Sequence, residues 1–241
     1  MTELRIGVVA EGPTDQIVLR HLLKAYCESA RSDIIPIFKD LQPNSDRTSS
    51  GSSEGGWREV YRWCRNNPPE ARDALFSGPG LFDNDLDDQR HDIILVHMDS
   101  DIIAEIGASS SVTPVPTETS TPEQRGTFIR KTLLEWLWPD GAIPDTRHIP
   151  APVVEAIEAW LVAALSDDEQ PEAVKTVKRR FIEVYYQSMG RIAPANAMKL
   201  KNPRDRYEQA ALRCTANIAK VAERCPHFRS LAETLFPAAI P

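Results

Sequence analysis

Two short runs of β-branched and apolar residues, each ending abruptly in acids, constrain this chain more than any other feature. Residues 4–10 read LRIGVVA and are followed by Glu11, and residues 92–98 read DIILVHM and are followed by Asp99 and Asp101. Apolar runs of this length are typical of strands that are buried inside a sheet. We therefore predict two interior strands with carboxylates at their carboxyl ends.

Helical patterns alternate with these strands along the first two thirds of the chain. The apolar spacing predicts helices over residues 15–29, 57–65, 124–138 and 153–165, and weaker strand patterns occupy residues 34–38 and 147–149. This alternation favours an α/β fold in which helices flank a parallel sheet. From about residue 167 only helical patterns follow, two or three in number. We predict a metal-binding catalytic domain over residues 1–166 and an all-helical C-terminal extension over residues 167–241.

The acids at the strand ends predict a metal site. Ligands of open α/β sheets bind beyond the carboxyl ends of the strands, so Glu11, Asp99 and Asp101 converge if the first and third strands are neighbours. Converging carboxylates raise one another's pKa unless a cation neutralises them. Oxygen ligands without His or Cys favour Mg²⁺ or Mn²⁺ over zinc, and a phosphate ester is the natural substrate of such a site.

Two polar residues close to these acids in the sequence, Asp15 and His97, have interpretations that do not involve a metal. His97 lies inside the predicted strand, where we expect a hydrogen-bonded core histidine and not a metal ligand. Asp15 opens the first predicted helix, where an acid favours the helix dipole.

Charge is unevenly distributed along the chain. The net charge of −7 argues against a simple non-specific nucleic-acid binder. An acidic segment contains Asp83, Asp85, Asp87, Asp88, Asp92, Asp99, Asp101 and Glu105 against Arg90. A later basic segment contains Lys175, Lys178, Arg179, Arg180, Arg191, Lys199, Lys201, Arg204 and Arg206 against Glu183 and Asp205. We predict that these bases, apart from Arg191, contact the phosphate backbone of a nucleic acid.

The remaining composition indicates a cytoplasmic protein without a membrane segment. No apolar run is long enough to cross a bilayer, and no export signal is visible. The 4 cysteines form no CxxC pair, so we expect reduced thiols that are partly buried.

The motifs EGPTD at residues 11–15 and DSD at residues 99–101 resemble those of the TOPRIM domain of topoisomerases, primases and OLD-family nucleases. The resemblance covers roughly residues 4–165. Within TOPRIM proteins the chain looks closest to a small group related to the OLD nucleases. Two further motifs carry that likeness, IEAWL at residues 157–161 and CPHF at residues 225–228. The chain departs from the group's pattern at Asp15, where Glu is commoner.

The resemblance implies roles for individual residues. Glu11 would be a metal ligand or general acid/base, and Asp99 and Asp101 would bind Mg²⁺. Glu158, with Glu155 three residues before it on the same helix face, would complete a second metal position. Proteins of the OLD type also use a lysine that stabilises the transition state, for which Lys199 and then Lys201 are the candidates.

These observations favour a Mg²⁺-dependent nuclease that cleaves phosphodiester bonds, with DNA as the preferred substrate over RNA. The OLD resemblance implies a role in prokaryotic defence against phage or plasmids. It also implies an ATPase partner on a separate chain, because no GxxxxGK[ST] motif is present here. An oligomer is compatible with the sequence. Two alternatives stay open: a nucleotide-sugar transferase that uses the DxD motif, and a non-catalytic regulatory or assembly subunit of an ATPase complex.

Overall fold

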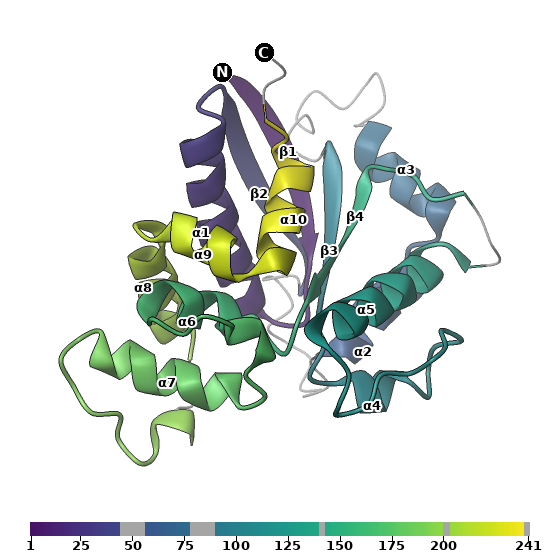
Figure 1. Cartoon of the computed structure of the whole chain (residues 1–241). Helices are drawn as coiled ribbons and strands as arrows, with labels where there is room; N and C mark the ends of the chain where they lie inside the picture. The colour runs from purple at the N-terminus through teal and green to yellow at the C-terminus, as the bar shows by residue number, and fades with distance from the viewer. Residues whose placement is uncertain (44–55, 78–89, 140–142, 200–202, 239–241) are drawn as a thin grey trace.

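The computed structural model describes residues 1–43, 56–77, 90–139, 143–199 and 203–238 (Figure 1). Within them, four strands form one all-parallel sheet in the spatial order β2-β1-β3-β4. The strands are β1 (Thr2–Val9), β2 (Ile34–Gln42), β3 (Ile93–Asp99) and β4 (His148–Val153). The prediction of an α/β fold with a parallel sheet is confirmed, and β1 and β3 are neighbours.

Helices cover both faces of the sheet. They are α1 (Pro13–Ala30), α2 (Trp57–Asn66), α3 (Pro69–Ser77), α4 (Ile103–Ile106), α5 (Pro122–Leu137), α6 (Glu158–Leu165), α7 (Val177–Gln187), α8 (Arg204–Thr215), α9 (Ile218–Arg224) and α10 (Pro226–Leu235), with short 3-10 helices η3 (Pro171–Ala173) and η4 (Ala197–Lys199). In Figure 1, α1, α6 and the yellow-green C-terminal helices lie on one side of the sheet, and α2 to α5 lie on the other. No helix in the described ranges combines the length and apolarity needed to cross a membrane.

Alternation along the strands divides the core into two clusters. Leu95 of β3 packs into the cluster that contains α1 and α6, whereas Ile94 and Val96 pack into the cluster that contains α2 and α5. This follows from the period of two in a strand, which points successive side chains to opposite faces. Polar residues on one parity of β3 therefore share a face with α1.

The predicted helix over residues 153–165 is wrong at its start. Strand β4 continues to Val153, and α6 begins only at Glu158. Pro150 and Pro152 make this stretch look unlike a strand, since proline cannot donate a ladder hydrogen bond. They are tolerated because β4 is an edge strand that pairs with β3 alone among the described strands. Strand β2, the other edge, likewise extends past the predicted Phe38 to Gln42.

After α6 the described residues contain four α-helices, more than the two or three expected. Their buried side chains join the same hydrophobic cluster as those of β1, α1 and β4. The boundary predicted between residues 166 and 167 therefore runs through one hydrophobic core, to which residues on both sides of it contribute.

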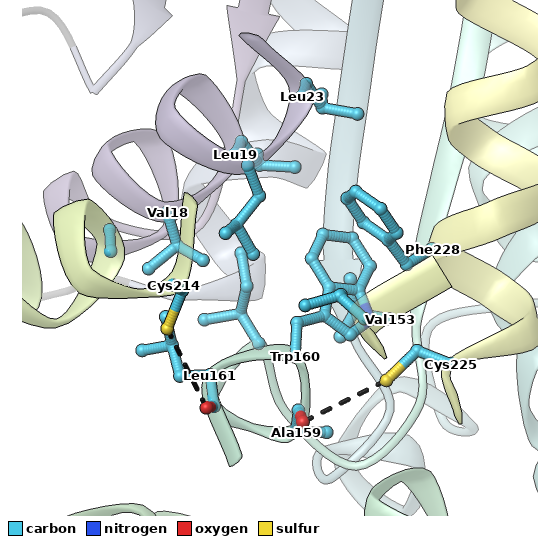
Figure 2. Packing of buried hydrophobic residues seen from close by; sticks show 14 of the residues in the cluster. Val18, Leu19, Leu23, Val153, Ala159, Trp160, Leu161, Cys214, Cys225 and Phe228 are labelled. Carbon is cyan, nitrogen blue, oxygen red and sulfur yellow. Dashed lines mark hydrogen bonds between the residues drawn. The ribbon is translucent and has the colours of Figure 1, made fainter. Parts of the chain in front are cut away.

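The IEAWL and CPHF motifs meet inside that core, as Figure 2 shows. The rings of Trp160 and Phe228 pack edge to face with centroids 5.1 Å apart. The indole N–H of Trp160 donates to Glu172, whose other oxygen lies 2.9 Å from Nδ1 of His227. All 4 cysteines are free thiols, as predicted, and all are buried. Both motifs thus join α6, η3 and α10.

Candidate metal centre

Glu11 and Asp99 meet where β1 and β3 end. The main-chain N–H of Asp99 donates to Oε1 of Glu11 at 2.7 Å. Oδ1 of Asp99 accepts a hydrogen bond from the N–H of Ile157 at 3.1 Å, just before α6. Asp99 is only 5% exposed. The predicted convergence of the first and third strand ends therefore brings these two carboxylates together.

Three further acids surround this pair. Asp15, in the first turn of α1, and Glu158, the first residue of α6, are both buried. Asp101 follows the end of β3, and the charges of Glu11, Asp15, Glu158 and Asp101 all raise the pKa of Asp99. The cluster thus gathers five carboxylates from the ends of β1 and β3 and the starts of α1 and α6, and we call these five residues the acidic centre.

Burial and mutual repulsion raise the pKa values of four acids of this centre, namely Glu11, Asp15, Asp99 and Glu158. Burial, followed by the charge of Asp15, raises the pKa of Glu11 to about 8. Burial, followed by the charge of Glu158, raises the pKa of Asp15 to about 7. The pKa of Asp99 is raised well above its ordinary value, first by burial and then by Glu11. Such carboxylates are costly to ionise together, so a cation would stabilise them.

One lysine approaches the acidic centre. Nζ of Lys178, near the start of α7, donates to Oδ2 of Asp101 at 2.7 Å. Burial disfavours the charged ammonium, but the hydrogen bond to Asp101 and the charge of Asp99 outweigh it and raise the pKa of Lys178. A single ammonium cannot neutralise five carboxylates.

Only one of the two carboxylate oxygens of Glu158 has a hydrogen-bond partner among the described residues. The hydroxyl of Tyr207, on α8, donates to Oε1 of Glu158. Oε2 of Glu158 is buried and has no hydrogen-bond partner among the described residues. A buried carboxylate oxygen without a donor is unfavourable unless a cation or another donor reaches it. The residues therefore fit a divalent cation with oxygen ligands.

His97 belongs to this centre as well. It lies two residues before Asp99 on the same face of β3, and its Nε2 is 3.4 Å from Oδ1 of Asp99. Asp15, His97 and Asp99 each offer a ligand atom, and these atoms all lie within 4.8 Å of one another. Burial lowers the pKa of His97 to about 4, so its ring is neutral near pH 7. The main chain of Ala151 acts as a hydrogen-bonding neighbour of the ring, as expected for a core histidine, but neither ring nitrogen has a hydrogen bond of good geometry within the described residues.

Glu155 does not share a helix face with Glu158, contrary to the prediction. It precedes α6 in a left-handed conformation with φ of 61°, because β4 runs on to Val153 and the chain must turn before the helix. Its carboxylate pairs with Arg125 of α5 at 2.6 Å, and Arg125 also donates to the carbonyl of Ser100 at 3.0 Å. The N–H of Asp101 donates to the carbonyl of Glu155 at 2.9 Å. Glu155 thus braces the turn that carries Asp99 and Asp101.

The predicted basic stripe is only partly exposed. Lys175, Lys178 and Arg179 lie at or just before the start of α7 and are exposed, whereas Arg180 pairs with Asp168 at 2.8 Å. Arg206 is 8% exposed and donates to the carbonyl of Ala197, so it offers no surface charge, contrary to the prediction. Arg204 is exposed at the start of α8. Lys201, the side chain of Lys199 and the acids Asp83, Asp85, Asp87 and Asp88 lie outside the described residues.

Sequence reasoning missed four contributors to the site. Asp15 lies one helical turn beyond Glu11, and His97 has the strand parity of Asp99, so spacing alone could have indicated both. Lys178 and Tyr207 come from α7 and α8, and no local pattern connects them to the acids. The lysine that the structure brings to the carboxylates is Lys178, which had been assigned to the stripe.

A scan against protein-family models and searches of curated proteins and of solved structures found no match to the chain.

Proposed function

We propose that this chain is a divalent-metal-dependent nuclease that hydrolyses phosphodiester bonds, with DNA as its preferred substrate. The observation that carries the proposal is the acidic centre, in which five carboxylates surround the carboxyl ends of β1 and β3 with Lys178 as their neighbouring cation. Carboxylates gathered at such a density are typical of sites that hold Mg²⁺ or Mn²⁺ together with a phosphate group.

Glu11, Asp99 and Asp101 are the proposed metal ligands, and Asp15 and Glu158 extend the set toward a second position. A bound divalent cation would supply charge neutralisation for the phosphoryl oxygens and lower the pKa of a water molecule. Asp15, Asp99 and Glu158 are buried, and electrostatic interactions are stronger there than in water.

The chain's own residues divide the remaining work. Oε1 of Glu11 is engaged by the N–H of Asp99, which leaves Oε2 to accept or release a proton during hydrolysis. The side chain of Lys178 is half exposed, and its ammonium lies beside Asp101, where it can contact a non-bridging phosphate oxygen of the substrate. Lys175 and Arg179 flank Lys178 and would follow the nucleic-acid backbone away from the centre.

The resemblance of EGPTD and DSD to TOPRIM motifs supports the same function. In this proposal the catalytic α/β unit is TOPRIM-like and the helices after residue 166 are its extension. The likeness to the OLD-related group further suggests an effector of prokaryotic defence that works with an ATPase on a separate chain.

The test is cleavage of supercoiled plasmid, linear duplex, single-stranded DNA and RNA, each with Mg²⁺, Mn²⁺ or EDTA. D99N is the key variant, since asparagine keeps the acceptor for the N–H of Ile157 while removing the charge. D73N is the matched control, because Asp73 is an exposed acid of α3. We expect metal-dependent cleavage by the wild type and by D73N. In D99N we expect the cleavage rate to fall by about a hundredfold or more. Equal cleavage by D99N would exclude the acidic centre as the active site.

A failure to cleave any substrate with any metal, with or without an added ATPase, would favour the regulatory-subunit alternative. Release of a sugar from a nucleotide sugar, with all nucleic acids left intact, would favour the transferase alternative.

A further inference from the structure

His97 is a fully buried polar residue of the site region to which the proposed mechanism gives no role. It projects from β3 toward the acidic centre and is fully buried. Within the described residues neither ring nitrogen has a hydrogen bond of good geometry, and the main chain of Ala151 is only a loose hydrogen-bonding neighbour. Burying an imidazole without hydrogen bonds costs free energy. A leucine would fill a buried strand position without that cost.

The position of the ring indicates what would offset the cost. Nε2 lies 3.4 Å from Oδ1 of Asp99, and a carboxylate oxygen of Asp15 completes a group of three ligand atoms within 4.8 Å of one another. Ligands that share one ion are separated by about 3 Å when each lies about 2.0–2.2 Å from it. Small side-chain adjustments therefore suffice to place His97, Asp15 and Asp99 around one ion.

We propose that His97 is a metal ligand, and that the position formed by Asp15, His97 and Asp99 takes a divalent first-row transition ion such as Mn²⁺ in preference to Mg²⁺. Mg²⁺ strongly prefers oxygen ligands and gives up its water reluctantly, so an imidazole adds little to its binding. Transition ions bind imidazole nitrogen readily, and their affinity for mixed nitrogen and oxygen sites exceeds that of Mg²⁺. This inference rests on the proposed metal-dependent function, and it makes a transition ion such as Mn²⁺ the preferred ion in place of Mg²⁺.

The test measures the ligand directly, with Mn²⁺ as the probe. Electron spin echo envelope modulation of Mn²⁺ bound to the intact chain should show coupling to an imidazole ¹⁴N. The pattern should change to that of ¹⁵N when the protein is made with ¹⁵N-histidine. This readout needs no substitution and no catalytic activity. Bound Mn²⁺ without nitrogen coupling would overturn the proposal, and so would failure of the chain to bind Mn²⁺.

Substitution then assigns the nitrogen. H97Q should lose the coupling and weaken Mn²⁺ binding by about tenfold or more, since losing even an outer-shell partner of a metal costs about that much. Its Mg²⁺ affinity should change far less, so the preference for Mn²⁺ shrinks. The control is H21Q, because His21 lies on α1 and its ring pairs with Glu208, which is not one of the five acids of the centre; H21Q should behave as the wild type. Retained coupling in H97Q would exclude His97, and H97N replaces it if H97Q does not fold.

The outcomes separate this inference from the nuclease proposal. Nitrogen-coupled Mn²⁺ in a chain that cleaves no nucleic acid would support the role of His97 and count against the nuclease. Cleavage by a chain whose bound Mn²⁺ shows no nitrogen coupling would support the nuclease and overturn the role of His97.

Discussion

Single residues of the acidic centre are held in an unfavourable state of charge. Glu11 and Asp15 have pKa values of about 8 and about 7 in the folded chain, against ordinary values of 4.5 and 3.8. At a pH between its ordinary and its raised pKa, each of these carboxyl groups is protonated in the folded state and ionised in the unfolded state. The free energy of unfolding therefore falls as the pH rises through this window. His97 acts in the opposite direction, but only between its lowered pKa of about 4 and its ordinary value of 6.5.

Above pH 6.5 the acids therefore dominate, and we predict that the Tm of the metal-free protein falls between pH 6.5 and pH 8.5. Differential scanning calorimetry in EDTA measures this, with D15N as a variant whose Tm should depend less on pH. Added Mn²⁺ should raise the Tm more at the higher pH, because the ionised carboxylates bind the cation. A metal-free Tm that stays level or rises over this range would show that folding does not disfavour the ionised form of these carboxylates.

Lys178 provides a second prediction at the residue scale. We expect K178Q to lose about a hundredfold in cleavage rate, the usual cost of removing one stabilising contact to transition-state charge. Arg179 is adjacent, and its side chain is 78% exposed and pairs with Glu183 at 3.2 Å, so R179Q is the matched control and should change the rate by only a few fold. The assay is single-turnover cleavage at saturating metal. Equal losses of cleavage rate in both variants would indicate a general attraction to the nucleic-acid backbone and no specific role for Lys178.

At the scale of elements, the contact between α6 and α10 depends on Trp160. This side chain is fully buried, packs on Phe228 and donates to Glu172. We predict that W160A lowers the free energy of unfolding by about 3–5 kcal/mol, the usual range for removing a large buried aromatic. Urea unfolding followed by circular dichroism measures it. The half-buried Trp63 on α2 is the control, and W63A should cost clearly less; equal losses would contradict the assignment of Trp160 to the core.

Elements also show where sequence reasoning succeeds. β1 and β3 were predictable because interior strands are continuous apolar runs, and Glu11 and Asp99 could be placed at their ends from that pattern alone. The full length of β4 was not, since Pro150 and Pro152 are acceptable only on an edge, and edge position is a tertiary property. The same error put Glu155 on a helix.

For the whole molecule, the C-terminal helices complete the core over one face of the sheet. Side chains of α8 and α10, including Cys214 and Phe228, belong to the cluster that contains Leu19 and Leu23 of α1 (Figure 2). We predict that a chain ending at Ser166 loses cooperative unfolding, because its sheet and α1 would expose this surface to water. Thermal unfolding followed by near-ultraviolet circular dichroism tests this. A sharp transition in the shortened chain would support an independent domain over residues 1–166.

Long-range assembly also limits what sequence could reveal about the site. Lys178 reaches Asp101 across 77 residues, and Tyr207 reaches Glu158 across 49. No spacing rule connects positions so far apart, so only the folded arrangement of α6, α7 and α8 could identify them. The acids at strand ends, by contrast, follow from topology.

The most direct test of the account is isothermal titration calorimetry of Mn²⁺ and of Mg²⁺ into the metal-free wild type and D99N at pH 8. Asp99 lies at the middle of the acidic centre, and its side-chain hydrogen bond is one that asparagine can keep. The account predicts saturable binding by the wild type and at least tenfold weaker binding by D99N, whose fold is preserved. Equal binding by both proteins, or no binding by the wild type, would contradict the central claim that these carboxylates form a metal site.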